Sequence, residues 1–158
     1  MFEKNRSLIE NLMMDYSESI DSKEYERWPE LFTEDGHYRV TNSDDFYQGY
    51  KHGIIWVDSR GMMKDRVSAL REANVYEEQG YRHLNSMVRV LKEDPDSNTL
   101  SLTSSFMVVR ILHTGETHLF ATGKYLDRIQ IKDNVALFKE RIVVCDSQRI
   151  DTLLAIPL

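Results

Sequence analysis

The chain has 158 residues, 41% hydrophobic and 29% charged, which is the composition of one globular domain with a core of its own. A net charge of −6 at pH 7 argues against nucleic acid as the main partner. The sequence has no run of 18 apolar residues, no apolar signal core at its N-terminus and a single cysteine, Cys145. We therefore expect a cytoplasmic protein without a membrane span or an internal disulfide.

The first third of the chain predicts two helices followed by short strands. An amphipathic helix is expected over residues 4–20, where apolar residues recur at helical spacing at Ile9, Leu12, Met13, Tyr16 and Ile20. A second helix is expected over residues 23–32, with Pro29 kinking or restarting it. Beyond it we expect a turn at 33–36, a strand at 37–41, a loop at 42–45, a strand at 46–50 and an apolar segment at 53–57.

The stretch that starts at Asp58 predicts a long helix studded with charges. Its apolar period near 3.6 suits a helix packed on a sheet, with apolar positions at Met62, Met63, Val67, Leu70, Ala73 and Val75. Charged residues stand between these positions, and they need partners if they are covered, either within the chain or on another subunit. The arginines of this stretch and of the strand that follows it are Arg66, Arg71, Arg82 and Arg89.

From Tyr81 onward the pattern becomes a meander of long strands. In the first of them, one face is expected to carry Leu84, Ser86, Val88 and Val90. Turn-forming residues separate four strands, expected near 81–93, 99–113, 117–131 and 135–147. Helices followed by such a meander predict one α+β domain over residues 1–158, with helices on one face of a strongly curved antiparallel sheet. This layout resembles the cystatin-like cone of nuclear transport factor 2, the NTF2-like fold.

The residues that carry metal chemistry are few. A Rieske or zinc centre needs Cys and His ligands at short spacing, and one cysteine cannot supply them. His113 and His118 are five residues apart across an expected turn, but no third ligand stands beside them. The sequence therefore predicts no metal site on this chain.

Acid–base chemistry is the stronger candidate for a site inside the cone. Asp65, Tyr81 and His83 are the candidate set, with His83 as the general base and the carboxylate orienting it. The alternative is that His83 is a structural histidine whose hydrogen bonds a neighbour satisfies. Cys145 lies in an apolar strand without an activating group, so we expect an inert thiol.

Several ordered segments resemble one family over nearly the whole length. They are ERWPELFTEDGHYRV at 26–40, RHLNSMVRV at 82–90, SFMVVR at 105–110, LFATGKYLDR at 119–128 and KERIVVCDSQRIDTLLAIPL at 139–158. The chain is similar in these to the small, or β, subunits of aromatic-ring-hydroxylating (Rieske non-haem iron) dioxygenases. Within that family, residues 65–77, 110–127 and 144–158 look most like terephthalate dioxygenase small subunits, with salicylate hydroxylase and anthranilate dioxygenase as neighbouring alternatives.

The resemblance implies a non-catalytic subunit that braces a large α subunit, commonly as three copies of each. The α subunit would hold the Rieske [2Fe–2S] cluster and the mononuclear iron, and a separate reductase would supply electrons from NADH. The complex would hydroxylate a monocyclic aromatic carboxylate, with terephthalate favoured. No catalytic, cofactor-binding or metal residue is then expected on this chain.

Two rival interpretations remain open on the sequence. One is a stand-alone isomerase or dehydratase that uses His83 and Asp65 in an open hollow, and the other is a plain scaffold module. If the chain is a subunit, intersubunit ion pairs are expected at Arg66, Arg71, Arg82 and Arg89.

Overall fold

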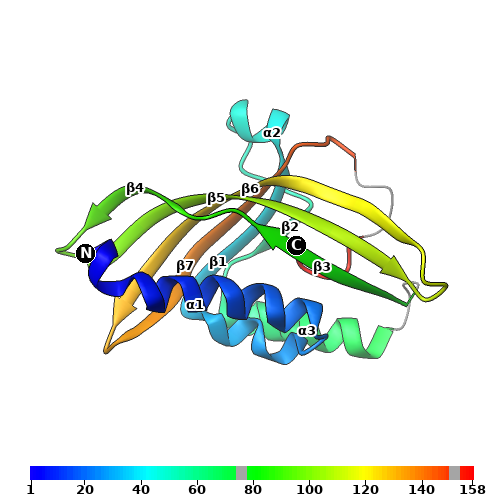
Figure 1. Cartoon of the computed structure of the whole chain (residues 1–158), viewed down its shortest axis with the longest axis horizontal. Helices are drawn as coiled ribbons and strands as arrows, with labels where there is room; N and C mark the ends of the chain where they lie inside the picture. Colours follow the sequence, from blue (N-terminus) through cyan, green and yellow to red (C-terminus); the bar gives the residue numbers. More distant parts are fainter. Residues whose placement is uncertain (74–77, 150–153) are drawn as a thin grey trace.

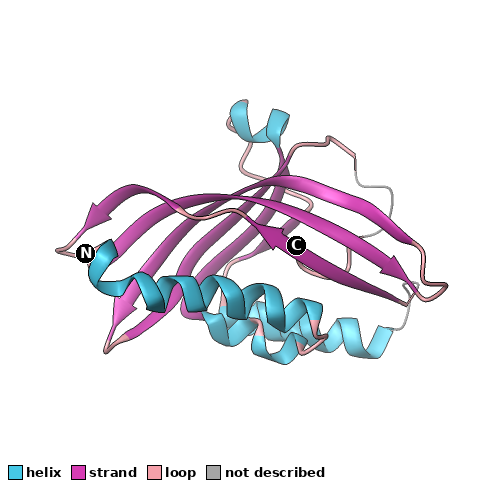
Figure 2. Ribbon diagram, in the orientation of Figure 1, coloured by secondary structure: helices cyan, strands magenta, loops and turns pink. Residues whose placement is uncertain are grey.

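A single curved sheet carries the long helices on one of its faces (Figures 1 and 2). The computed structural model describes residues 1–73, 78–149 and 154–158. Within these residues the sheet has seven strands in the order β2-β1-β7-β6-β5-β3, and β4 pairs with β5 beyond the end of β3. Helices α1 and α3 lie against the inner face of the sheet, whereas the short α2 projects from the other side (Figure 1). The elements therefore form the predicted cone, with its interior between the helices and the sheet.

The boundaries of the elements are as follows. The helices are α1 (Phe2–Asp21), α2 (Ser43–Tyr47) and α3 (Arg60–Ala73), with two 3₁₀ turns at η1 (Tyr25–Arg27) and η2 (Pro29–Leu31). The strands are β1 (Phe32–Asn42), β2 (Ile55–Val57), β3 (Gln79–Asn85), β4 (Arg89–Asp94), β5 (Thr99–Leu112), β6 (Thr117–Lys132) and β7 (Val135–Cys145).

The first predicted helix is confirmed, and its apolar stripe faces the sheet. Ile9, Leu12, Tyr16 and Ile20 of α1 are all buried, as the helical spacing requires. The long helix is also confirmed as α3, which buries Met63, Val67 and Leu70. The predicted position Val75 lies outside the described residues.

The predicted helix at 23–32 is wrong, because the chain there makes only the two 3₁₀ turns. Lys23 has a φ of 59°, which ends helical geometry directly after α1. Pro29 opens the second turn, where its missing N–H costs no hydrogen bond. The interruption turns Trp28 inward, and its ring packs edge-on against Phe32 and Tyr38. The expected turn at 33–36 is absorbed into β1, which begins at Phe32.

The predicted strand at 46–50 is also wrong, since residues 43–47 form the short helix α2. The cause is local: the Asn42 side-chain oxygen accepts a hydrogen bond of 2.9 Å from the Asp45 backbone N–H and so caps the helix. The apolar segment at 53–57 becomes the short edge strand β2, which pairs antiparallel with β1.

The meander β5–β6–β7 is antiparallel as predicted, and β3 and β4 pair antiparallel with β5. The sheet as a whole is mixed, because β1 pairs parallel with β7. A parallel pair needs a long crossover, and α2, β2, α3 and the meander provide it. This pairing places β1 beside β7 within the sheet, although about 90 residues of chain lie between them.

The strand expected at 81–93 is broken into β3 and β4. Odd-numbered residues face inward in β3, whereas even-numbered residues face inward after the break. Tyr81 and His83 are the buried residues of β3, whereas Leu84 points outward and is 49% exposed. The break at 86–88 is held to β5 by two 2.9 Å hydrogen bonds between Ser86 and Ser105. The expectation that Leu84 and Val90 share one face is therefore wrong, since Val90 packs against the core.

No helix in the described part of the chain is both long enough and apolar enough to cross a membrane.

The core lies between α1, α3 and the inner face of the sheet, and it includes the segment 154–158. Leu154, Ile156 and Leu158 of this segment are all buried. Their position at the centre of the cone decides what the interior can do.

Candidate functional site

The interior of the cone is built around a buried ion pair between two neighbouring strands. Asp127 of β6 and Arg141 of β7 face each other in register. The guanidinium donates from Nε and Nη2 to the two carboxylate oxygens at 2.7 and 2.8 Å. Arg141 is 1% exposed and Asp127 is 3% exposed. A bidentate pair so far from water holds both groups in one geometry.

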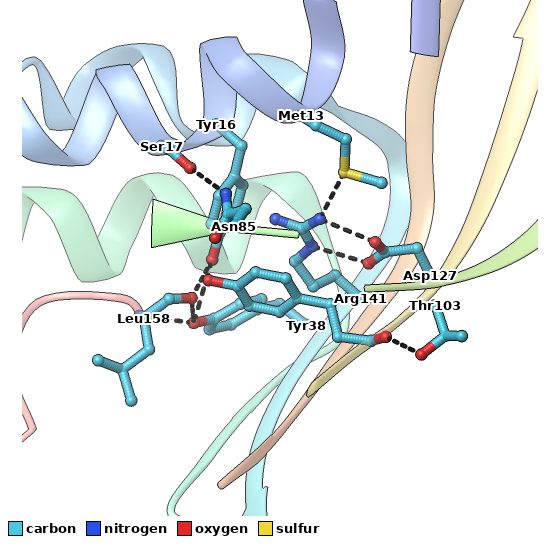
Figure 3. A network of polar contacts seen from close by, with 10 residues as sticks. Met13, Tyr16, Ser17, Tyr38, Asn85, Thr103, Asp127, Arg141 and Leu158 are labelled. Atoms are coloured by element: carbon cyan, nitrogen blue, oxygen red, sulfur yellow. Dashed lines mark hydrogen bonds and ion pairs between the residues drawn. The ribbon is translucent and has the colours of Figure 1, made fainter. Parts of the chain in front are cut away.

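Three aromatic rings lie close to the Arg141 guanidinium, which Figure 3 shows between Asp127 and Met13. Its central carbon lies 4.0 Å from the ring centres of Tyr16 and Tyr125 and 4.2 Å from that of Phe138. Nη2 also approaches the Met13 sulfur at 2.9 Å. Burial lowers the pKa of Arg141, but Asp127 more than offsets it, so the pKa lies above its ordinary value. The cation is therefore permanent, and its Nε and Nη2 are engaged, whereas its buried Nη1 has no hydrogen-bond partner within the described residues. This enclosure fits a structural group.

Two tyrosines of the interior bind the segment 154–158. The hydroxyls of Tyr16 and Tyr38 both donate to the Leu158 carbonyl oxygen, the Tyr38 bond measuring 3.1 Å (Figure 3). The Leu158 N–H donates in turn to the Tyr38 hydroxyl at 3.0 Å. Burial raises the pKa of both phenols, that of Tyr38 well above its ordinary value, so both remain protonated.

Arg66 of α3 fastens the same segment from the helix side. Its Nη2 donates to the carbonyl oxygen of Leu154 at 2.9 Å and lies 3.5 Å from that of Ala155. Burial lowers the pKa of Arg66. Aromatic rings and residues 154–158 thus belong to the core of the cone, where a stand-alone isomerase would need an open pocket.

His83 forms a close pair with Asp21 rather than with Asp65. The imidazole Nδ1 lies 2.6 Å from the Asp21 Oδ1, and the His83 backbone N–H donates to Oδ2 at 2.9 Å. Tyr81 lies on the same inner face, with its ring centre 6.3 Å from that of His83. Asp65 is exposed on α3. The structure thus brings Tyr81 and His83 together, but the carboxylate beside His83 is that of Asp21 at the end of α1 and not that of Asp65.

The His83 side chain is fully buried, and its Nε2 has no hydrogen-bond partner among residues 1–73, 78–149 and 154–158. A general base must reach the proton it removes. Because this nitrogen is buried and the Tyr16 and Tyr81 rings lie near the imidazole, the arrangement fits the alternative of a structural histidine, which ties β3 to the last turn of α1.

We expect Asp21→Ala to lower the free energy of unfolding by about 2–3 kcal/mol, because it leaves a buried imidazole N–H and a backbone N–H without acceptors. Urea unfolding followed by circular dichroism measures this. Asp65→Ala is the matched control and is expected to change little, since Asp65 is exposed. Equal effects of the two substitutions would contradict the structural assignment.

Cys145 is a buried free thiol at the end of β7. Burial raises its pKa to about 12, with Asp146 adding to the effect. Almost no thiolate is then present at pH 8, which agrees with the inert thiol expected from the sequence.

This gives a direct labelling prediction. At pH 8 we expect iodoacetamide to leave Cys145 of the folded chain unmodified. The same chain in urea should be labelled completely in the same time, because unfolding exposes the thiol and returns its pKa to the ordinary value. Mass spectrometry reads the result. Labelling of the folded chain at a rate close to that in urea would contradict it.

The structure gathers no group of three or more His, Cys, Asp or Glu side chains that could hold a metal ion in the described ranges. His118 lies across the β5–β6 turn, 3.8 Å from Glu116, and its side chain is half exposed. Together with the lone cysteine, the donor set does not fit a Rieske cluster, whose ligands are two cysteines and two histidines.

The four arginines expected at subunit contacts fall into two groups. Arg66 and Arg71 have partners within the chain: Arg66 binds the segment 154–158, and Arg71 pairs with Glu26 at 2.8 Å. The Arg82 side chain is 68% exposed and lies 4.0 Å from Asp21. Arg89 is exposed on β4 and forms no ion pair within the described ranges. Arg66 and Arg71 are therefore held within the chain, whereas the side chains of Arg82 and Arg89 are exposed.

The sequence contained one signal of the buried pair that the interpretation missed. Asp127 is two residues away from both Tyr125 and Ile129, and Arg141 is two residues away from Val143, so each charged residue shares the inward face of its strand with apolar or aromatic residues. Charges of opposite sign on the apolar faces of two strands joined by a hairpin indicate a buried pair. No comparable local pattern pointed to Asp21 as the partner of His83, since 62 residues separate them.

The chain resembles known proteins along most of its length. Residues 17–152 match the model of the ring hydroxylating beta subunit family. Subunit beta 1 of the terminal oxygenase component of terephthalate 1,2-dioxygenase from Comamonas sp is 48% identical to this chain over 143 residues. The match covers 90% of this chain and 92% of that protein. The anthranilate 1,2-dioxygenase small subunit of Burkholderia cepacia is 35% identical over 144 residues, covering 90% of this chain and 88% of that protein.

A solved structure agrees with these sequence matches. The crystal structure of an aromatic-ring-hydroxylating dioxygenase β subunit from Novosphingobium aromaticivorans superposes with a TM-score of 0.89 at 29% identity, covering 99% of this chain and 98% of that chain. The cone is therefore the NTF2-like fold in the form that these subunits have. By the family model and the extent of identity, the chain belongs to the ring-hydroxylating dioxygenase β subunits.

Proposed function

We propose that the chain is the structural, non-catalytic small subunit of a terminal oxygenase that hydroxylates terephthalate. The observation that carries the substrate is the 48% identity to terephthalate dioxygenase β subunits, against 35% for the anthranilate dioxygenase small subunit. The burial of the interior supports a non-catalytic role, since the His83 side chain is fully buried and Leu154, Ile156 and Leu158 belong to the core. A salicylate-hydroxylating complex has no support among these matches.

In this proposal the partner is a large α subunit, joined as three copies of each chain. The α subunit holds the Rieske cluster and the mononuclear iron, and a separate reductase delivers electrons from NADH. The donor set of this chain supports that division, because it has one cysteine and no described cluster of metal-ligating side chains. Arg82 and Arg89 remain as candidates for ion pairs between subunits.

Co-expression tests the proposal. The chain is produced with the large subunit of a terephthalate dioxygenase, purified, and supplied with reductase, NADH and O₂. We expect co-purification and NADH-dependent hydroxylation of terephthalate, and no hydroxylation by either this chain alone or the reductase alone. Product is measured by chromatography, and iron by metal analysis of each purified component.

The matched control is an anthranilate dioxygenase large subunit assayed with anthranilate. Weaker co-purification and lower activity are expected there, because this chain is more distant from the small subunit of that enzyme. Equal or better support of the anthranilate enzyme would overturn the choice of terephthalate. Stoichiometric iron or hydroxylation with this chain alone would overturn the non-catalytic role.

A further inference from the structure

The sulfur of Met13 contacts the buried cation at the centre of the cone. Met13 lies on α1, is partly buried and packs against the core. Its Sδ accepts from the Arg141 Nη2 at 2.9 Å (Figure 3). A thioether sulfur is a weak acceptor, whereas a guanidinium is a strong donor. One N–H of a permanent cation is therefore matched with a poor partner.

The geometry of the guanidinium places a second donor beside this sulfur. The Asp127 carboxylate takes the N–H of Nε and one N–H of Nη2, which together form one side of the planar group. The other N–H of Nη2 points toward the end of the group, where it lies next to an N–H of Nη1. Nη1 is buried and has no hydrogen-bond partner in the part of the chain that the structure describes. An oxygen bonded to the Met13 sulfur would therefore accept from Nη2 and come within reach of Nη1.

Other methionines of the two long helices have different surroundings. Met14, the next residue of α1, is 69% exposed, and Met62 of α3 is 46% exposed. Met63 of α3 is fully buried in the apolar core. An oxidised sulfur is polar, so water solvates it at Met14 or Met62, whereas at Met63 it would be buried among apolar side chains. At Met13 a strong donor is already in place.

We propose that Met13 is an oxidation site, at which a peroxide converts the thioether to a sulfoxide whose oxygen Arg141 binds. The step transfers one oxygen atom to the sulfur. The O–O bond of hydrogen peroxide breaks, an S–O bond forms, the sulfur loses two electrons, and the second oxygen leaves as water with both protons. The sulfoxide oxygen is a stronger acceptor than the sulfur, so the contact becomes a charge-assisted hydrogen bond.

This modification is expected to stabilise the fold rather than damage it. Asp127 and Arg141 join β6 to β7, and the contact with Met13 extends this join to α1. A stronger bond at Met13 holds α1 more firmly on the sheet and offers the buried Nη1 an acceptor. The inference goes beyond the proposed function and does not depend on it, because it concerns the interior of this chain alone.

Treatment of the full-length chain with hydrogen peroxide tests the site. Tandem mass spectrometry of proteolytic peptides distinguishes a sulfoxide on Met13 from one on Met14. We expect Met14, Met62 and Met87 to be oxidised first, Met13 to follow while the chain remains folded, and Met63 to stay unmodified. Circular dichroism of the same samples verifies the fold. Unmodified Met13 in a chain whose exposed methionines are fully oxidised would overturn the proposal.

Urea unfolding of the treated chain tests the bond to Arg141. The Met13→Leu variant acquires the same surface sulfoxides but none at position 13, so it is the matched control. We expect oxidation to raise the urea midpoint of wild type relative to that of Met13→Leu by about 0.5 M, the shift for one added hydrogen bond to a charged group. An equal change in the two proteins, or a larger loss in wild type, would contradict the proposal.

Glutamine at position 13 provides a test without peroxide. Its side-chain oxygen stands in for the sulfoxide oxygen, so Met13→Gln should have a urea midpoint at least equal to that of wild type. Met63→Gln places the same amide in the apolar core and should have a much lower midpoint or fail to fold.

The double variant Asp127→Leu/Arg141→Met shows whether the cation is the partner. This background lacks the guanidinium, so Met13→Gln is expected to lower its urea midpoint, in contrast to its effect in wild type. An effect of Met13→Gln that has the same sign and size with and without Arg141 would reject Arg141 as the group that receives the oxidised side chain.

Discussion

Replacing Asp127 by Ala is expected to lower the free energy of unfolding by about 3–5 kcal/mol, because it leaves the Arg141 guanidinium buried without a counter-charge. The aromatic rings around the cation cannot replace a bidentate carboxylate. The double variant Asp127→Leu/Arg141→Met removes both charges and should recover most of the loss. Urea unfolding at neutral pH measures each variant.

The single substitution Arg141→Met should show a characteristic pH dependence. Burial raises the pKa of Asp127, and without Arg141 nothing opposes it. A folded-state pKa above the unfolded value favours folding at low pH, and this contribution is lost as pH rises through the folded pKa. The variant is therefore expected to be more stable at pH 5 than at pH 8.

The control for both substitutions is Arg27→Met. Arg27 is exposed and pairs with Asp15, Glu18 and Glu24 at the surface, so its loss is expected to change stability little. If Asp127→Ala were as mild as Arg27→Met, the central pair would not hold the cone together.

Replacing Ile156 and Leu158 by Ala is the second large effect, with an expected loss of about 5 kcal/mol in the free energy of unfolding. Both side chains are buried in the middle of the cone, where α3 and the sheet cannot close fully over the space they leave. The variant should also bind a hydrophobic dye in its folded state, because the interior becomes accessible. Urea unfolding and dye fluorescence measure the two effects.

Two further variants serve as comparisons for the effect of Ile156→Ala/Leu158→Ala. Tyr16→Phe removes one hydrogen bond to Leu158 while preserving the ring, so a smaller loss of about 1 kcal/mol is expected. Val135→Ala removes apolar atoms from a side chain that is 51% exposed and should be nearly neutral. An Ile156→Ala/Leu158→Ala variant with wild-type stability would show that residues 154–158 only rest against the cone.

Local patterns along the chain were enough to predict the fold class and the family. Helical spacing predicted α1 and α3, and turn residues predicted the hairpins β5–β6 and β6–β7, because both signals are local. The ordered motifs predicted the subunit family, which the comparisons confirmed. Local signals failed at two places. The Asn42 side chain caps a helix where a loop and a strand were predicted, and the positive φ of Lys23 ends helical geometry where a second helix was predicted.

The side chains that meet inside the cone could be identified only from the three-dimensional arrangement of the chain. His83 and Asp21 are 62 residues apart, and the break in the strand at 86–88 reversed the faces on which the sequence analysis relied. The parallel pairing of β1 with β7 placed Tyr38 beside Tyr16 and Leu158. This is because burial and strand pairing depend on contacts between distant segments, whereas hydrophobic periodicity reports only on neighbouring residues of the same helix or strand.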